Sequence, residues 1–246
     1  MSVKAKEEIL ESEIVITEVV EQEIQESNQS NIILPYEIEK EYTIDPIGKL
    51  PRKPFYSFVK RAFDIFVSLI ALIITLPFIL LIAIIIKCSS KGPVFYKQER
   101  LGYKGKKFML VKFRSMRVDA ESQGAKWSDG DDDPRIYPFG RFLRRSHLDE
   151  IPQLWAILIG KMSLIGPRPE REVFAVEFEK YIHGFSERLK VKPGITGWAQ
   201  INGGYDLKPE EKIIYDVEYI KNRSLRMELK ILFKSVGVVL GRRGVK

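Results

Sequence analysis

The feature that most constrains this chain is an apolar run from Ile65 to Ile86, in which Ser68 and Thr75 are the only polar side chains. At about 1.5 Å of rise per residue, a helix of this length is long enough to cross a bilayer core of about 30 Å. The run therefore predicts a membrane-bound protein. A helix buried in the core of a soluble protein is the least favoured interpretation.

Pro77 lies near the middle of the run and predicts a kink, because proline lacks an amide donor and clashes with the preceding turn. The hydroxyl of Thr75 is placed to bind a carbonyl that such a kink frees. A single spanning helix with a tolerated proline is one interpretation. The other is a re-entrant hairpin that breaks at Pro77.

Basic residues flank the apolar run on both sides, and this favours the hairpin. The positive-inside rule gives a spanning helix no orientation here, but it fits a hairpin whose two ends are both cytoplasmic. We therefore assign residues 51–91 to a membrane-anchoring re-entrant helix. The flanking cations are Arg52, Lys53, Lys60 and Arg61 before the run, and Lys87, Lys91, Lys97 and Arg100 after it.

The net charge of +7 is unevenly distributed along the chain. Residues 1–50 contain 12 acidic residues and only 4 lysines, so the remainder is strongly basic. The acidic segment is expected to be a mostly disordered tail. The basic remainder indicates an anionic partner such as a membrane surface or a nucleotide. Nucleic acid is not expected as a partner, because no nucleic-acid-binding module is recognisable.

Residues 92–246 predict an α+β fold that is predominantly helical, with amphipathic helices at the membrane interface. Two strands at 94–98 and 107–113 form a small β-hairpin, with glycines in the turn. The helix expected at 225–240 has an apolar face that alternates with Lys230 and Lys234, and Arg242 and Arg243 follow it, so it either lies on an anionic membrane or packs into the core. The other expected helices are 140–145, 150–159, 171–182 and 209–222.

Asp149 and Glu150 are the first candidates for chemistry. Pro152 is tolerated only in the first turn of a helix, so Asp149 is expected at or next to the N-cap of the helix 150–159. The helix dipole would keep a carboxylate ionised there. Such a group can attack phosphorus as a nucleophile or bind Mg²⁺. Taken alone, however, two acids in a first helical turn are usually capping residues.

Arginines near this pair in the sequence point to phosphate binding. Arg144 and Arg145 precede the pair, and Arg168 is held between Pro167 and Pro169. A guanidinium group can bind phosphate through two parallel hydrogen bonds. The alternative is that the first two form a solvated or lipid-facing patch and that Arg168 lies in a rigid turn.

The remaining polar candidates are weaker. A solvated loop is favoured over a second metal site for the acidic run of Asp129, Asp131, Asp132 and Asp133. The segment from Asp133 to Arg135 has a structural role as its alternative. His147 and His183 are expected to pack or to form hydrogen bonds. The turn at 192–200, which contains Trp198, either shapes a pocket or is purely structural.

Several ordered segments carry a family resemblance from about Lys60 to the C-terminus. They are KRAFDIFVSL, the apolar run with Pro77, KGPVFYKQERLGYKGKKF, KFRSM, DPRIYPFGRFLRRSHLDEIPQL, GKMSLIGPRPE and KPGITGWAQING. Together they resemble the bacterial sugar transferases, which are monotopic phosphoglycosyl transferases. The resemblance implies transfer of a sugar-1-phosphate from a UDP-sugar to polyprenyl phosphate, usually undecaprenyl phosphate, with release of UMP.

The same resemblance implies a role for each matching residue. Asp149 would be the nucleophile that forms a covalent phosphosugar intermediate, Mg²⁺ would bind at the dyad, and Glu150 would assist. Arg144 would hold phosphate and Arg168 would contact the nucleotide, so Arg145, Pro167 and Pro169 are grouped with them as substrate-binding residues. Pro77 would mark the bend of the membrane helix. The expected location is the cytoplasmic face of a bacterial inner membrane, in the first membrane step of exopolysaccharide, capsule or glycoconjugate synthesis.

The chain departs from the family pattern in two respects. His147 stands where the family commonly has serine, and the acidic residues 1–50 look like a tail added to the short form of the family. The sequence does not identify the sugar, and it leaves open a homo-oligomer or association with downstream glycosyltransferases. The rival hypothesis is a non-catalytic membrane adaptor, whose basic body binds anionic lipid while its acidic tail recruits a partner.

Overall fold

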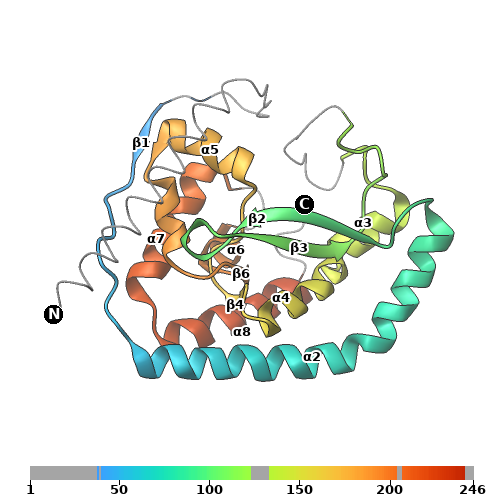
Figure 1. Cartoon of the computed structure of the whole chain (residues 1–246), viewed down its shortest axis with the longest axis horizontal. Helices are drawn as coiled ribbons and strands as arrows, with labels where there is room; N and C mark the ends of the chain where they lie inside the picture. The colour runs from blue at the N-terminus through green and yellow to red at the C-terminus, as the bar shows by residue number, and fades with distance from the viewer. Residues whose placement is uncertain (1–37, 39, 123–132, 204–206, 242–246) are drawn as a thin grey trace.

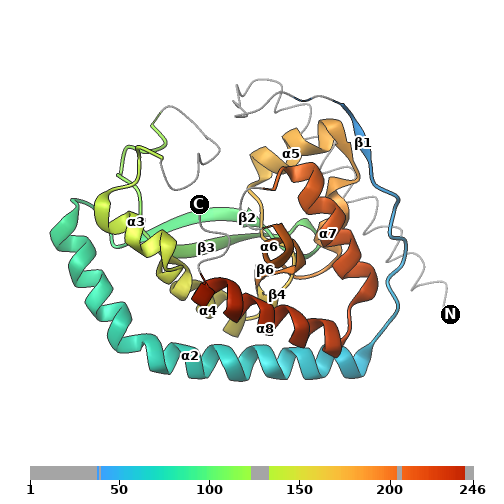
Figure 2. The ribbon, with the colours of Figure 1, turned by 180° about the vertical axis from the view of Figure 1, so that it is seen from behind.

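The protein is described by a computed structural model that covers residues 38, 40–122, 133–203 and 207–241. The fold is α+β and mostly helical, as predicted. Helix α2 (Pro54–Ser89) follows one edge of the molecule and bends at its end. The hairpin of strands β2 (Phe95–Leu101) and β3 (Lys107–Phe113) crosses the middle (Figures 1 and 2). Helices α5 (Glu172–Tyr181) and α7 (Pro209–Asn222) lie on the side away from the bend.

Helix α2 contains the whole apolar run and remains helical through Pro77 over its 36 residues. The predicted break is therefore a bend within one helix, which both views show clearly. The role expected for Thr75 was also wrong. Proline at position 77 frees the carbonyl of Ile73, but the Thr75 hydroxyl donates instead to the carbonyl of Ala71, at 2.6 Å.

The bend divides α2 into a first arm before Pro77 and a second arm after it, and both arms are joined to the same globular body. In the first arm, Arg61 donates to the carbonyls of Ile157 and Leu158, at 2.7 Å each, and so caps the end of α4 (Leu154–Leu158). In the second arm, Ile82 and Ile86 pack in a cluster with Phe113 and Leu143. The two ends of the helix are therefore tied to one structural unit.

A buried polar network strengthens the first of these connections. Glu228 of α8 (Leu225–Gly241) accepts hydrogen bonds from Tyr56 at 2.6 Å and from Tyr219 at 2.7 Å, and it forms an ion pair with Lys60 at 2.5 Å. The Lys60 ammonium also donates to the carbonyl of Ile165. Buried polar groups persist in folded proteins when they are paired in this way.

The outward surface of α2 is apolar, and within the described residues it is the one helix long and apolar enough to cross a membrane. Only 11% of its most apolar window is buried by the rest of the protein. An exposed apolar surface of this length is unusual for a protein surrounded by water. The large exposed side chains beyond Ser68 include Leu69, Ile73, Ile74, Leu76, Phe78, Leu80, Leu81 and Ile84.

The predicted hairpin is confirmed by β2 (Phe95–Leu101) and β3 (Lys107–Phe113), which pair antiparallel from Phe95↔Phe113 to Leu101↔Lys107. Its tip is the short 3-10 turn η1 (Tyr103–Gly105). A second two-stranded sheet pairs β4 (Ser163–Ile165) in parallel with β6 (Gly194–Thr196). This second sheet joins the main hydrophobic core to the segment that follows Ile165.

The predicted helices after residue 133 are observed, except for the one expected at 150–159. They are α3 (Pro138–Arg145), α5, α7 and α8, and the short helix α6 (Trp198–Gly203) lies between β6 and α7. Helix α8 packs into the core, which is one of its two alternatives, and its contact with a membrane stays a prediction. Ile231 is fully buried in the core, whereas Leu229 and Phe233 are 49% and 73% exposed.

The last part of the predicted acidic tail contacts the body. Strand β1 (Tyr42–Thr43) pairs in parallel with β5 (Ile182–His183), and the chain then continues to α2. Residues 1–37 and 39, to which the prediction of a disordered tail also applies, lie outside the described residues.

Candidate active site

The carboxylate pair lies in η3, a 3-10 helix from Leu148 to Gln153, and not at the start of an α-helix. Only α4, which follows it, is α-helical. The cap residue is His147, whose left-handed backbone (φ 56°) turns the chain between α3 and η3. Histidine is among the residues that adopt this conformation more readily. Pro152 lies inside the 3-10 turn, so it did not mark the start of an α-helix, and Asp149 is the second residue after the cap.

Asp149 and Glu150 are both buried, with 7% and 8% exposure, beneath the β2–β3 hairpin. The pKa of Asp149 is raised to about 7, because burial and then the neighbouring Glu150 charge raise it more than Lys112, Arg144 and Arg168 lower it. The expectation that a helix dipole keeps Asp149 ionised was therefore wrong. A short 3-10 turn supplies little dipole, and loss of hydration dominates.

Glu150 differs from its neighbour because it has a partner. Burial acts to raise the pKa of Glu150, but the charge and hydrogen bonds of Arg168 outweigh it, so this pKa lies below its usual value. Nη2 of Arg168 forms an ion pair with Oε1 of Glu150, and Nη1 lies 3.4 Å from Oε2. The two adjacent carboxylates thus differ in role: Glu150 is paired and ionised, and Asp149 is poised to change its charge.

The backbone that presents Arg168 is held at several points. The carbonyls of residues 167–170 accept hydrogen bonds from Gly194 N, Arg188 Nη2, Arg100 Nη1 and Leu101 N, at 2.9, 2.9, 3.2 and 2.9 Å respectively. Pro167 and Pro169 restrict the same backbone further. The rigid turn predicted from Pro-Arg-Pro is thus held by hydrogen bonds from several other elements.

Lys112 of β3 was missed by the sequence analysis. Burial lowers its pKa to about 8, an effect that the charge of Asp149 opposes. Phe108, Leu110 and Lys112 alternate along one face of the strand, and the first two are buried. A lysine at an inward position of an otherwise apolar face was the signal that could have identified it.

The structure separates the other predicted residues. Arg144 is partly buried at the end of α3 and close enough to lower the pKa of Asp149, whereas Arg145 beside it is exposed. Trp198 packs in the core, donates to Glu218 at 2.8 Å and lies beneath Lys230 of α8. Its ring therefore joins α6 to α7 and α8.

The acidic run and the second histidine contribute little within the described residues. Asp133 is buried and forms an ion pair with Arg135 at 2.5 Å, which is the structural alternative considered for it. Residues 129–132 lie outside the described part of the chain, so the alternative of a second metal site in the acidic run stays untested. His183 is exposed and lies 3.5 Å from Glu41.

The donor atoms of the dyad show whether it suits a Mg²⁺ ion. Asp149 and Glu150 offer hard carboxylate oxygens, but no group of three or more acidic, histidine or cysteine side chains gathers in the described residues. Mg²⁺ commonly takes one or two carboxylates and completes its shell with water and substrate phosphate. The residues therefore fit a Mg²⁺ ion that binds together with a phosphorylated substrate.

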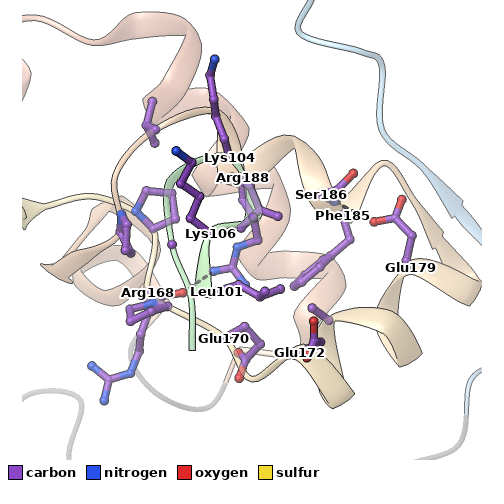
Figure 3. A pocket seen from close by; sticks show the side chains of 18 of the residues that line it. Leu101, Lys104, Lys106, Arg168, Glu170, Glu172, Glu179, Phe185, Ser186 and Arg188 are labelled. Atoms are coloured by element: carbon purple, nitrogen blue, oxygen red, sulfur yellow. Dashed lines mark hydrogen bonds between the residues drawn. The ribbon is translucent and has the colours of Figure 1, made fainter. Parts of the chain in front are cut away.

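A cavity of about 270 Å³ opens on the far side of the Pro167–Pro169 segment (Figure 3). Its walls are mainly apolar and come from the hairpin tip, α5 and the 3-10 helix η4 (Phe185–Lys190). Arg188 is buried beside it, stacks 4.7 Å from the centre of the Phe185 ring and pairs with Asp216 at 2.8 Å. In Figure 3 the Arg168 side chain turns away from Arg188, while its carbonyl accepts the Arg188 hydrogen bond.

The structure thus combines a buried carboxylate pair, surrounded by the charges of Lys112, Arg144 and Arg168, with an exposed apolar helix. Residues 55–242 match the family model described as bacterial sugar transferase, and the chain belongs to this family.

Two similar proteins carry names that specify a reaction. The UDP-N-acetylgalactosamine-undecaprenyl-phosphate N-acetylgalactosaminephosphotransferase of Aeromonas hydrophila is 39% identical over 203 residues, which are 81% of this chain and 48% of that protein. The UDP-glucose:undecaprenyl-phosphate glucose-1-phosphate transferase of Xanthomonas campestris pv. campestris is 41% identical over 201 residues, which are 80% and 42% of the two chains. This chain thus spans about half the length of these relatives.

A third relative is shorter. The exopolysaccharide production protein PSS of Rhizobium leguminosarum bv. phaseoli is 39% identical over 186 residues, which are 72% of this chain and 93% of that protein.

Proposed function

We propose that this protein transfers a sugar-1-phosphate from a UDP-sugar to undecaprenyl phosphate and releases UMP. The observation that carries the proposal is the buried dyad, in which Asp149 adjoins Lys112 and Glu150 is fixed by Arg168. The names of the relatives support the general reaction, because they specify UDP-sugars and undecaprenyl phosphate. These names differ in the sugar, so the sugar is left open here.

The reaction is proposed to proceed in two displacements at phosphorus. A carboxylate oxygen of Asp149 attacks the sugar-bearing phosphate, a new O–P bond forms, and the bond to the UMP oxygen breaks. An oxygen of the lipid phosphate then attacks the same phosphorus and releases Asp149. Lys112, Arg144 and Arg168 supply positive charge where negative charge gathers in both steps.

Glu150 is proposed to assist Asp149 in two ways. Its fixed negative charge raises the pKa of Asp149, and its ion pair with Arg168 orients the guanidinium that contacts the diphosphate. If Mg²⁺ binds, Asp149 and Glu150 are the residues that would hold it, and it would neutralise charge on the diphosphate.

The cavity beside Pro167–Pro169 is the proposed place for the nucleoside. Its volume is just below the roughly 300 Å³ at which small-molecule pockets begin, so it suits part of the donor and not all of it. Nη1 of Arg188 is buried beside this cavity and makes no hydrogen bond to the described residues. Arg168 would then lie between the base and the phosphate that Asp149 attacks.

The bent helix α2 is proposed to enter and leave the membrane on the same side. Its two arms are tied to one body, and its outward surface is apolar. The phosphate of a lipid carrier lies at the membrane surface, so this arrangement would bring the acceptor to the dyad. We place the catalytic domain on the cytoplasmic face of a bacterial inner membrane, in the first membrane step of a surface glycan.

The direct test is to trap the covalent intermediate. The purified protein is incubated with Mg²⁺ and a panel of UDP-sugars labelled in the sugar-bearing phosphate, without lipid acceptor. One sugar should label the protein and release one equivalent of UMP, and undecaprenyl phosphate should then discharge the label. Asp149→Asn should neither label nor turn over, while Asp45→Asn, which changes an exposed acid far from the dyad in the sequence, should behave as the wild type.

The same experiment separates the enzyme from the adaptor hypothesis. A membrane adaptor would release no UMP with any donor, and its biological effect would survive loss of both carboxylates. Full turnover by Asp149→Asn would remove Asp149 as the nucleophile.

A further inference from the structure

Residues 40–50 form a strap along the body, upstream of the family match that begins at residue 55. Tyr42 and Thr43 pair with β5, and the amide of Ile44 donates to the carbonyl of His183 at 2.8 Å. The amide of Ile47 donates to Oε2 of Glu187 at 2.7 Å. The strap is thus hydrogen-bonded to both β5 and η4.

Apolar side chains reinforce these hydrogen bonds. Tyr42 and Ile44 pack against the cluster that contains Phe178 and Phe185. Ile47 and Leu50 pack against the main core. The intervening Thr43 is exposed, as the alternation of side chains along a strand requires.

The strap meets η4 at the residue next to the one that holds Arg168. Glu187 binds the strap, and Arg188 binds the carbonyl of Arg168 at 2.9 Å and pairs with Asp216. Phe185, Arg188 and other residues of η4 also line the cavity beside Pro167–Pro169. A displacement of η4 would therefore alter the cavity wall and the Arg168 backbone together.

Two supports hold η4 through the adjacent residues Glu187 and Arg188. Helix α7 supplies Asp216 to Arg188, and the strap supplies the amide of Ile47 to Glu187. The first support lies inside the family match, and the second lies outside it. This chain therefore carries an additional restraint on the wall of the cavity.

We propose that the strap is a positioning element for the sugar-nucleotide donor: it fixes η4, and through Arg188 it holds Arg168 and the cavity wall in the arrangement that binds the donor. This inference rests on the proposed function, since it assigns the donor to that cavity. Glu187 and Ile44 are positioning residues in this scheme. Neither takes part in the displacements at phosphorus, so their loss should weaken donor binding and leave the chemical step intact.

The test compares Ile44→Ala and Glu187→Ala in the full chain. Each should raise the KM for the UDP-sugar about five- to tenfold, because each removes one packing or hydrogen-bond restraint on η4. The rate of covalent labelling at saturating donor should stay within about twofold of the wild type. Glu187→Gln keeps an oxygen acceptor for the Ile47 amide and should restore most of the wild-type KM.

Two control variants isolate the strap. Thr43→Ala changes an exposed side chain of β1 and should have no effect. Lys180→Ala removes an ion pair with Glu177 inside α5 (2.8 Å) that does not involve the strap or η4, and it too should keep a wild-type KM.

Hydrogen exchange gives a readout that does not depend on activity. Amides of residues 182–190 should exchange faster in Ile44→Ala and Glu187→Ala than in the wild type or the controls, while those of α7 should not change. If the wild type releases no UMP from any donor, the proposed function fails, and this measurement still tests the link from the strap to η4. Wild-type KM values in both variants, or an equal loss in labelling rate at saturating donor, would overturn the proposal.

Discussion

At the scale of single residues, Asp149 has surroundings that act on its pKa in opposite directions. Burial and Glu150 raise the pKa to about 7, while Lys112 is the first of three cations that lower it. A nucleophile with a pKa near neutral retains basicity and is still ionised in a useful fraction. In the proposed reaction, Lys112 therefore increases the fraction of Asp149 that is ionised and able to attack at a given pH.

We predict that Lys112→Met raises the pKa of Asp149 by about one unit, because a positive charge that favours the carboxylate is lost. The measurement is a ¹³C NMR titration in EDTA of protein labelled at its aspartate carboxyls, with Asp149→Asn used to assign the signal. Lys112→Arg keeps the charge and should titrate near the wild type. An unchanged or lower pKa in Lys112→Met would contradict the electrostatic role given to Lys112.

The pair of Arg168 with Glu150 leads to a second prediction. Arg168→Lys keeps the charge but loses the planar fork that reaches both oxygens of Glu150, so it should reduce kcat/KM for the donor about 10²-fold. Steady-state kinetics measures the loss. Its control is Lys180→Arg, which alters a partly buried cation of α5 paired with Glu177 and should leave kcat/KM unchanged. If Arg168→Lys were fully active, charge alone would suffice at this position.

At the scale of elements, Gly166 determines how closely β4 approaches β6. A Cβ added there would lie 2.4 Å from the carbonyl oxygen of Lys192 and 2.9 Å from the amide nitrogen of Gly194, both of them backbone atoms. Gly166→Ala must therefore separate the strands and displace Arg168, two residues later. We expect it to destabilise the protein by about 1–3 kcal/mol and to reduce the rate of covalent labelling.

Thermal unfolding and the labelling rate, measured on the same samples, check this expectation. Gly237→Ala is the matched control, because a Cβ there meets nothing within 4 Å and alanine favours the helix. That variant should be as stable as the wild type or slightly more so. Equal behaviour of the two variants would show that the close approach of β4 and β6 is not required.

The elements that sequence could predict are those with local signals. Helix α7 was predicted with its observed bounds, because Pro209 starts it and the Glu211 side chain accepts from the amide of Lys208. The region of the dyad was predicted wrongly, since Pro152 is compatible with a 3-10 turn as well as with the first turn of an α-helix. Local sequence rules do not distinguish a 3-10 turn from the first turn of an α-helix. The packing of this segment under the hairpin decides which of the two forms.

The site was recoverable from sequence only in part, for the same reason. Asp149, Glu150 and Arg168 were singled out from their local pattern and given roles by the motif resemblance, and the structure places Arg168 against Glu150. The link from Arg188 to Arg168 joins residues 20 apart, and the bond from Ile47 to Glu187 joins residues 140 apart. No periodicity in the sequence reports contacts of that range, because they depend on how the elements pack.

At the scale of the whole molecule, the bend of helix α2 underlies the proposal that both of its ends lie on the same side of a membrane. The arm before Pro77 is tied to Ile157, Leu158 and Glu228, and the arm after it packs on Phe113 and Leu143. A straight spanning helix would have to give up one of these two sets of contacts, since its ends would lie on opposite sides. In the proposed arrangement the bend lets both sets persist while the apolar surface between them enters lipid.

The chain offers a direct test, because its one cysteine, Cys88, is exposed near the end of the second arm. We predict that Cys88 and a cysteine placed at Arg52 in a Cys88→Ser background react with a membrane-impermeant maleimide from the same side of sealed vesicles. Phe78→Cys in that background, at the bend, should stay unreactive until detergent is added, because its side chain would lie in lipid. Labelling of positions 52 and 88 from opposite sides would establish a spanning helix, and the body could not then hold both arms as it does here.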